Sequence, residues 1–260
     1  MNRMKFSAQE LYVLAAAAKK EKMYGLPDGF SWMPEEEMPV ARRQIADALL
    51  DEGVLVMDFD GKTSVAAEYV EMVNIYCDCS KCLTLNRQKE NGVSEDKIFW
   101  QYNERMYCAE AQEDDYVFHA VSEPEIQADL AQEKWTSVGA AGMETVIPQI
   151  ALTKAKRYAI KEKTEEALRI LKQNGADNRT AAVLYDGLRE KAQYLGLLLM
   201  DMSSGTCEKT EKAWLNGRGV IYSMGKTVVN LRTCTVFTEV EREAVSQDIE
   251  KLAAAFFRRE

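Results

Sequence analysis

The feature of this sequence that most restricts its possible folds is an order of predicted elements that occurs twice. Residues 1–134 and residues 135–260 each predict a group of helices, then short antiparallel strands, then one closing helix. At an offset of 116 positions, Tyr69 corresponds to Tyr185 and Leu83 corresponds to Leu199. Identity between the halves is weak, so the prediction of a duplicated chain rests on the shared order of elements.

This repeated order predicts an α+β, pseudo-two-fold (duplicated) fold in which a central antiparallel sheet is flanked by two helical bundles. Neither set of short strands can cover its apolar face alone, so we expect one shared sheet and one integrated domain. Apolar residues make up 47% and charged residues 29% of the chain, as in an ordinary globular protein. The longest apolar stretch, Leu11–Ala18, is far shorter than the roughly 20 residues of a membrane-spanning helix.

The first 76 residues predict a winged-helix-like unit, in which three helices accompany a short hairpin. Capping boxes at Ser7/Glu10 and Ser122/Glu125 predict helix starts, and Asp60-Gly61 predicts a hairpin turn. The predicted elements of this half are helices over about 7–20, 35–51, 65–76 and 122–132, a hairpin beginning at 54–59, and strands near 81–85, 97–101, 105–111 and 116–121.

The second half predicts one long helix followed by the same sequence of elements. Asn174-Gly175 is a helix stop, Met224-Gly225 predicts a turn between two strands, and Thr238/Glu241 predicts a third capping box. The predicted elements are helices over about 146–173 and 179–193, strands near 195–202, 220–223, 226–232 and 233–237, and a last helix whose apolar face is Val245, Ile249, Leu252 and Phe256.

Charge and histidine content argue against several classes of function. The net charge is −9, so the chain lacks the excess of cations by which proteins neutralise nucleic-acid phosphates. His119 is the only histidine, which removes the commonest general base and metal ligand from most sites. We therefore expect neither an enzyme nor a nucleic-acid-binding protein, and no cofactor. The first residues lack the cleavage site of a signal peptide, which favours a cytoplasmic location.

The sharpest local signal is a cluster of three thiols, Cys77, Cys79 and Cys82. They could hold zinc, with Cys108 or His119 as a fourth ligand from a neighbouring strand. A structural zinc site usually has two separated ligand pairs, whereas this chain has one cluster, so we predict buried free cysteines at a helix-to-strand junction and no metal. Cys108 and His119 could also form a nucleophilic pair on adjacent strands, although a single strand histidine is more often simply packed.

A loop rich in turn-forming residues carries the candidate protein-binding residues Phe30, Trp32 and Met33. Aromatic residues and methionine are common at the centres of protein interfaces. The alternative interpretation is that these side chains cover the first helical cluster as an apolar lid.

Several features spread along the chain resemble those of a known protein family. They are Phe6–Leu14, Gly25–Pro27, Ala48–Val54, and the closing strand and capped helix of each half. In these features the chain resembles the EspG-type chaperones of type VII (ESX) secretion systems, and related uncharacterised proteins encoded with such systems in Gram-positive bacteria. The resemblance covers nearly the whole length and rests on order and pattern, with no residue motif to carry across. The cysteine cluster departs from that family.

The resemblance implies a cytosolic, non-enzymatic chaperone or adaptor that holds helical-hairpin secretion substrates before export, through sheet loops and the C-terminal helical bundle. Its partners would be those substrate proteins, with a homodimer left open, and without nucleic acid or membrane insertion. Two alternatives remain. A winged-helix transcriptional regulator fits the first 76 residues, but its third helix carries Glu68 and Glu71 and no Lys or Arg between residues 65 and 76. A zinc or thiol protein would use the Cys77-Cys79-Cys82 cluster.

Overall fold

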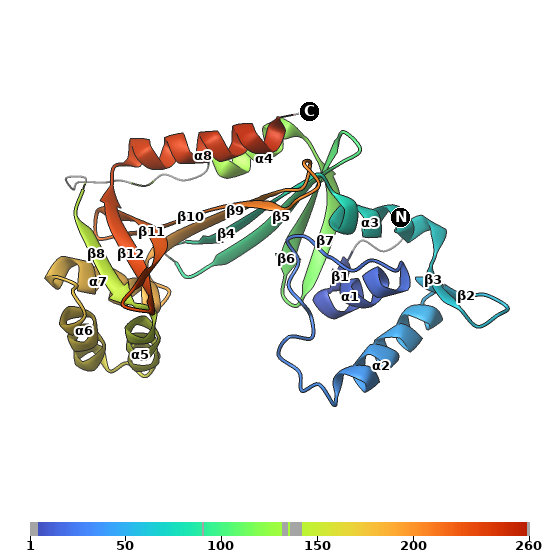
Figure 1. The fold of residues 1–260 in the computed structure, drawn as a ribbon, viewed down its shortest axis with the longest axis horizontal. Coiled ribbons are helices and arrows are strands. Elements are labelled where there is room, and N and C mark those ends of the chain that lie inside the picture. Colours follow the sequence, from blue (N-terminus) through green and yellow to red (C-terminus); the bar gives the residue numbers. More distant parts are fainter. Residues whose placement is uncertain (1–4, 90, 132–134, 136–141, 259–260) are drawn as a thin grey trace.

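The protein is described by a computed structural model that covers residues 5–89, 91–131, 135 and 142–258 (Figure 1). It is a mixed α/β fold with eight helices and a large antiparallel sheet among these residues. No helix in the described part of the chain combines the length and apolar character needed to span a membrane.

The first half of the chain begins with a short strand and a helical cluster. Apolar positions three and four apart in these helices face the core, and the described strands follow in consecutive hairpins. The elements are β1 (Lys5–Ser7), α1 (Ala8–Ala17), α2 (Met38–Asp51), β2 (Leu55–Met57), β3 (Thr63–Val65), α3 (Ala67–Asp78), β4 (Lys81–Gln88), β5 (Ser94–Tyr102), β6 (Arg105–Gln112), β7 (Asp115–Val121) and α4 (Glu123–Leu130).

The second half runs through a similar order of elements. They are β8 (Glu144–Pro148), α5 (Gln149–Ile160), α6 (Thr164–Gln173), α7 (Asn178–Leu188), β9 (Gln193–Asp201), β10 (Glu208–Gly217), β11 (Val220–Val229), β12 (Arg232–Val240) and α8 (Arg242–Phe257).

One ten-stranded sheet joins strands of both halves, in the order β1-β7-β6-β5-β4-β9-β10-β11-β12-β8. The halves meet where β4 pairs with β9, and Leu83 lies directly opposite Leu199 there. The hairpin β2–β3 forms a separate two-stranded sheet. The predicted boundary between residues 134 and 135 adjoins residues outside the described part, so the division into two halves stays a prediction.

Each face of the large sheet carries different helices (Figure 1). On one face, α4 and α8 pack over a core that includes Leu83, Phe99 and Trp214. On the other face, the cluster of α1, α2 and α3 covers one end, packing on Trp100 and neighbouring residues, and the cluster of α5, α6 and α7 covers the other, packing on Tyr222 and its neighbours. Strand alternation produces this division, because successive side chains point to opposite faces.

Several local predictions are confirmed. The hairpin around Asp60-Gly61 is present, with Gly61 at a φ of +74° and the Asp58 carboxylate accepting from the backbone N–H groups of Asp60 and Lys62. Ser7 and Glu10 form their capping box at α1. Ser122 and Glu125 form theirs at α4, whose described part ends at Leu130. The prediction that this helix reaches about residue 132 falls on a residue outside the described part.

The predicted long helix over 146–173 is wrong. Residues 144–148 form the edge strand β8 on β12, and Glu162 at a φ of +58° lies in the turn that separates α5 from α6. Ile147 is fully buried in the strand. A short apolar segment such as Val146-Ile147 is compatible with either a helix or a strand. It forms a strand here because it pairs with the edge strand β12.

Other strand predictions in the second half need correction. β11 runs unbroken through Met224-Gly225, because this pair lies opposite Phe237 and Val236 of β12 within the ladder. Thr238 is part of β12, so α8 begins at Arg242 after Glu241 and has no side-chain cap. Strand β10 was not predicted, because its first half, Glu208–Lys212, is polar and exposed. The short edge strand β1 was not predicted either.

Candidate functional site

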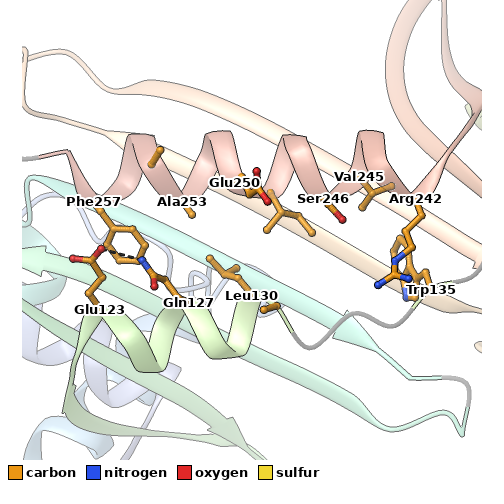
Figure 2. A pocket seen from close by; sticks show the side chains of 13 residues that line it. Glu123, Gln127, Leu130, Trp135, Arg242, Val245, Ser246, Glu250, Ala253 and Phe257 are labelled. Atoms are coloured by element: carbon orange, nitrogen blue, oxygen red, sulfur yellow. Dashed lines mark hydrogen bonds between the residues drawn. The ribbon is translucent and has the colours of Figure 1, made fainter.

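A groove of about 570 Å³ lies between α4 and α8 (Figure 2). Apolar and small side chains line its floor, and a few polar side chains stand along its edges. The lining residues are Glu123, Gln127, Leu130, Ala131, Trp135, Arg242, Val245, Ser246, Ile249, Glu250, Ala253, Ala254 and Phe257. Concave apolar surfaces with a few polar groups are the usual form of a binding site.

Helix α8 has two adjacent apolar faces. Leu252 and Phe256 pack on the sheet, whereas Ile249, Ala253 and Phe257 recur four apart and line the groove. Residues four apart lie above one another on a helix, so these three side chains form a continuous stripe along its axis. The sequence places Ile249 on the same apolar face as Leu252 and Phe256. In the structure Ile249 packs partly buried against the core of those two residues and also lines the groove.

Helix α4 supplies the opposite wall. Its start is stabilised by the Glu125 carboxylate, which accepts from the Ser122 N–H at 2.8 Å and from its hydroxyl at 2.6 Å. The Ser122 hydroxyl bond is the main reason that the pKa of Glu125 is lowered. Ile126 packs on the sheet, and Gln127, which donates to Glu123 at 3.0 Å, turns toward the groove. The capping box therefore sets where the wall begins.

Two long cationic side chains of β4 hold the C-terminal ends of both groove helices. Lys81, on the same strand face as Leu83, donates from Nζ to the carbonyl oxygens of Ala255 at 2.9 Å and Arg258 at 2.6 Å at the end of α8. At the other end of that face, Arg87 donates from Nη2 to the carbonyl oxygen of Asp129 in α4. Cations at helix C-termini satisfy open carbonyl groups and complement the helix dipole. The sheet thereby fixes both walls.

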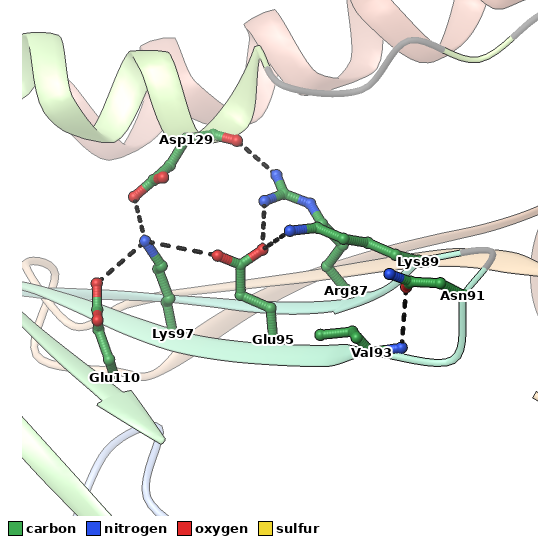
Figure 3. Close-up of polar contacts among 8 residues, drawn as sticks. All are labelled: Arg87, Lys89, Asn91, Val93, Glu95, Lys97, Glu110 and Asp129. Carbon is green, nitrogen blue, oxygen red and sulfur yellow. Dashed lines mark hydrogen bonds and ion pairs between the residues drawn. The ribbon is translucent and has the colours of Figure 1, made fainter. Parts of the chain in front are cut away.

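Arg87 belongs to a larger, partly buried network of charged side chains (Figure 3). Its Nη1 donates to Glu95 Oε2 at 3.0 Å, and Lys97 contacts Asp129 Oδ2 at 2.9 Å and Glu110 Oε1 at 3.1 Å. Burial raises the pKa of Glu95, but the bonds from Arg87 outweigh it and the net shift is downward. Burial likewise lowers the pKa of Lys97, and its carboxylate partners raise it overall. Both shifts favour the charged forms.

Each end of the groove carries a charged side chain, Arg242 at one end and Glu123 at the other. Trp135 lies beside Arg242, and Phe257 lies at the other end with Glu123 (Figure 2). The indole of Trp135 is only 2% exposed, and its Nε1 has no hydrogen-bond partner among the described residues. The indole therefore contributes to the groove through its ring.

The predicted protein-binding residues lie elsewhere, beside the N-terminal helical cluster. Phe30 is 1% exposed and packs edge-on against Tyr12 at 5.3 Å, under the guanidinium of Arg42. Met33 packs partly buried against the same core, whereas Trp32 is 73% exposed. Phe30 thus acts as a lid residue, and binding through this loop stays a prediction that depends on Trp32 and Met33.

The cysteine cluster lies at the junction of α3 and β4. Cys77, Cys79 and Cys82 are free and buried, and burial raises the pKa of the first two thiols to about 12. These thiols are not among the groups of potential metal ligands that the described residues bring together. Cys108 lies two strands away from Cys82 and on the opposite face of the sheet, next to α4.

The prediction that Cys108 and His119 lie on adjacent strands is confirmed, since they are direct partners in the β6–β7 ladder. Burial raises the pKa of the Cys108 thiol to about 12, so the thiol is protonated and a weak nucleophile at neutral pH.

Comparison with known proteins gives one family and one structural similarity. Residues 1–133 match the family model described as "Domain of unknown function (DUF5081)". No curated protein matches the chain. Among solved structures, the chain is similar to the Mycobacterium tuberculosis type VII secretion system chaperone EspG5, determined in complex with the PE25-PPE41 dimer, with a TM-score of 0.47, 11% identity, and coverage of 98% of this chain and 97% of that chain.

Proposed function

This chain belongs to the family of the domain of unknown function DUF5081, and we propose that it is a chaperone or adaptor for a type VII secretion substrate. The substrate would be a helical hairpin that the chaperone keeps in a soluble state in the cytoplasm before export. The resemblance of the sequence to EspG-type chaperones supports the class of substrate. The preformed apolar groove between α4 and α8 is the observation that carries the binding role.

The shape of the groove suits one amphipathic helix. The stripe Ile249, Ala253 and Phe257 offers contacts at helical spacing, and Leu130 faces it from the other wall. Ala131, Ser246 and Ala254 are small, so a partner helix can approach closely. Peptide helices commonly bind such grooves through apolar residues at positions i, i+3, i+4 and i+7.

The edges of the groove would orient the partner. Glu123 and Gln127 border it near Phe257, and Arg242 borders it near Trp135. A substrate helix with a basic residue at one end and an acidic residue at the other would match this arrangement. Rim charges of this kind set orientation and rate of association more than affinity.

The proposal assigns no catalytic step. The regulator alternative has less support, because Tyr69, Met72, Val73 and Tyr76 bury one side of α3 in the core beneath the sheet. A recognition helix must expose a face that enters a DNA groove. On the remaining face, Glu71 accepts from Tyr107 Oη at 3.0 Å, and an acidic face repels phosphate.

We further infer that the two halves arose by duplication. The strand order is symmetric about β4 and β9, α3 and α7 each precede one of these strands, and α4 and α8 each follow the last strand of a half. Superposition of the backbone of β4–β7 and α4 on that of β9–β12 and α8 is the check. A matching path with equivalent strand registers would support duplication, and divergent registers would contradict it.

The binding test uses a helical-hairpin protein encoded beside this chain's gene, produced together with it. Ile249→Asp places a charge on the groove stripe and is expected to weaken binding at least tenfold, because an unpaired carboxylate would be buried in the complex. Ala253→Leu fills the groove without adding charge and should also weaken binding. Dissociation constants from calorimetry give the measurement.

Gln247→Asp is the matched control, since it adds the same charge to an exposed position of α8 outside the groove. It should bind like the unaltered chain. Thermal unfolding of all variants shows that α8 stays docked. Unchanged affinity in both groove variants would exclude this groove as the site. Loss of binding in a Lys154→Glu variant would then place the site on the cationic surface of α5, where Lys154, Arg157 and Lys161 surround a shallow pocket.

A further inference from the structure

Three potential metal ligands meet on strands β6 and β7, outside the groove. Cys108 and Glu110 are two residues apart on β6 and therefore share one face, and His119 is the direct ladder partner of Cys108. The Cys108 Sγ, a carboxylate oxygen of Glu110 and a ring nitrogen of His119 all lie within 4.8 Å of one another. Cys108 is buried, and the other two are half-buried on the α4 side of the sheet.

We propose that Cys108, Glu110 and His119 form a binding site for a Zn²⁺ ion. Zinc is bound in proteins by thiolate sulfur, imidazole nitrogen and carboxylate oxygen, and this set offers one of each. Zinc–ligand distances of about 2.0–2.3 Å require the three atoms to move together by on the order of 1 Å. Side-chain rotation on a rigid two-strand ladder can supply that movement.

The surroundings of the three ligands are compatible with a metal. Lys97 Nζ contacts Glu110 through Oε1 at 3.1 Å, and a carboxylate can bind a metal through its second oxygen (Figure 3). Lys97 also contacts Asp129 at 2.9 Å, so its charge stays compensated when Glu110 turns toward the ion. Carboxylates that bind metals are commonly held by such an outer partner.

Zinc binding would release the proton of the Cys108 thiol. Cys108 is a free, buried thiol in this structure. Zinc binds the thiolate, and the proton leaves to solvent as the Zn–S bond forms. Three protein ligands leave one tetrahedral position for a water molecule. The ion would join β6 to β7 beneath α4.

The test titrates the metal-free full-length chain with Co²⁺, whose thiolate complexes absorb in the near ultraviolet. One equivalent per chain should produce the sulfur-to-cobalt band, with release of about one proton at pH 7.5. Zn²⁺ should displace Co²⁺ and raise the melting temperature in a concentration-dependent way. Absence of the band, or a band without a rise in melting temperature, would overturn the proposal.

Variants identify the ligands. Cys108→Ser should abolish the band, and His119→Gln should weaken Co²⁺ binding at least tenfold while leaving the fold intact, because His119 is only half-buried. Cys207→Ser removes the exposed thiol and should leave the band unchanged. Retention of the band in both Cys108→Ser and His119→Gln would contradict the site. Its loss in Cys82→Ser alone would assign metal binding to the Cys77-Cys79-Cys82 cluster instead.

Discussion

Replacing Arg87 by alanine is expected to lower the free energy of unfolding by about 3–5 kcal/mol, the usual cost of removing one partner from a buried charge pair. The side chain is almost fully buried, pairs with Glu95 at 3.0 Å, and donates to the Asp129 carbonyl at the end of α4. Its loss removes the most buried of the cations that contact Glu95, leaving Lys89 and Lys97 beside that carboxylate, and it removes the donor to the Asp129 carbonyl. Urea unfolding followed by circular dichroism measures the change.

Arg232→Ala is the control for Arg87→Ala, because Arg232 is an exposed arginine in the same sheet. It should change stability by less than about 0.5 kcal/mol. The Arg87→Ala penalty should shrink as pH falls, since the pKa of Glu95 is lowered in the fold and the ion pair is lost once that carboxyl takes up a proton. A penalty equal to that of Arg232→Ala would show that the network does not hold α4.

The loss of Arg87 should also weaken substrate binding in the α4–α8 groove. Arg87 fixes the C-terminal end of α4, which carries Leu130 and Ala131 of the groove wall. Arg87→Ala should therefore bind the secretion substrate more weakly than expected from its unfolded fraction alone. Normal affinity in a destabilised but folded variant would show that α4 keeps its place without this contact.

Replacing Trp100 by alanine is expected to cost about 3–5 kcal/mol, the range for removing a large buried aromatic side chain. Trp100 is fully buried, stacks on Phe118 with ring centroids 5.5 Å apart, and donates from Nε1 to the Tyr24 carbonyl oxygen at 2.8 Å. The substitution leaves a cavity between the sheet and the N-terminal helical cluster and an unsatisfied carbonyl group. Urea unfolding and near-ultraviolet circular dichroism measure the effect.

Trp32→Ala provides the comparison for Trp100→Ala, since it removes the same side chain from a position that is 73% exposed. It should lower stability by less than about 0.5 kcal/mol. Trp100→Phe should lie between the two, because it keeps an aromatic contact with Phe118 but loses the hydrogen bond. Similar losses at positions 32 and 100 would contradict the account of this core.

Local patterns predicted much of the fold. Alternating strands in the first half, the Asp60-Gly61 turn and the capping boxes at Ser7 and Ser122 depend on residues a few positions apart, and each formed where the pattern placed it. The placement of Cys108 and His119 on adjacent strands was also predicted, whereas their direct register pairing was not. The α4–α8 groove was not predicted either, since its walls come from segments more than 100 residues apart.

By itself, the sequence determined many of the local elements and which side chains are apolar. Only the tertiary structure decided that Val146-Ile147 joins a sheet edge, that Met224-Gly225 stays within a strand, and that Ile249 lines a groove between α8 and α4. Burying an apolar side chain against any apolar surface stabilises the fold. The sequence alone therefore does not determine which surface an apolar side chain will contact. That contact is determined by backbone hydrogen bonds and helix packing between distant segments, which form only when the chain folds and brings those segments together.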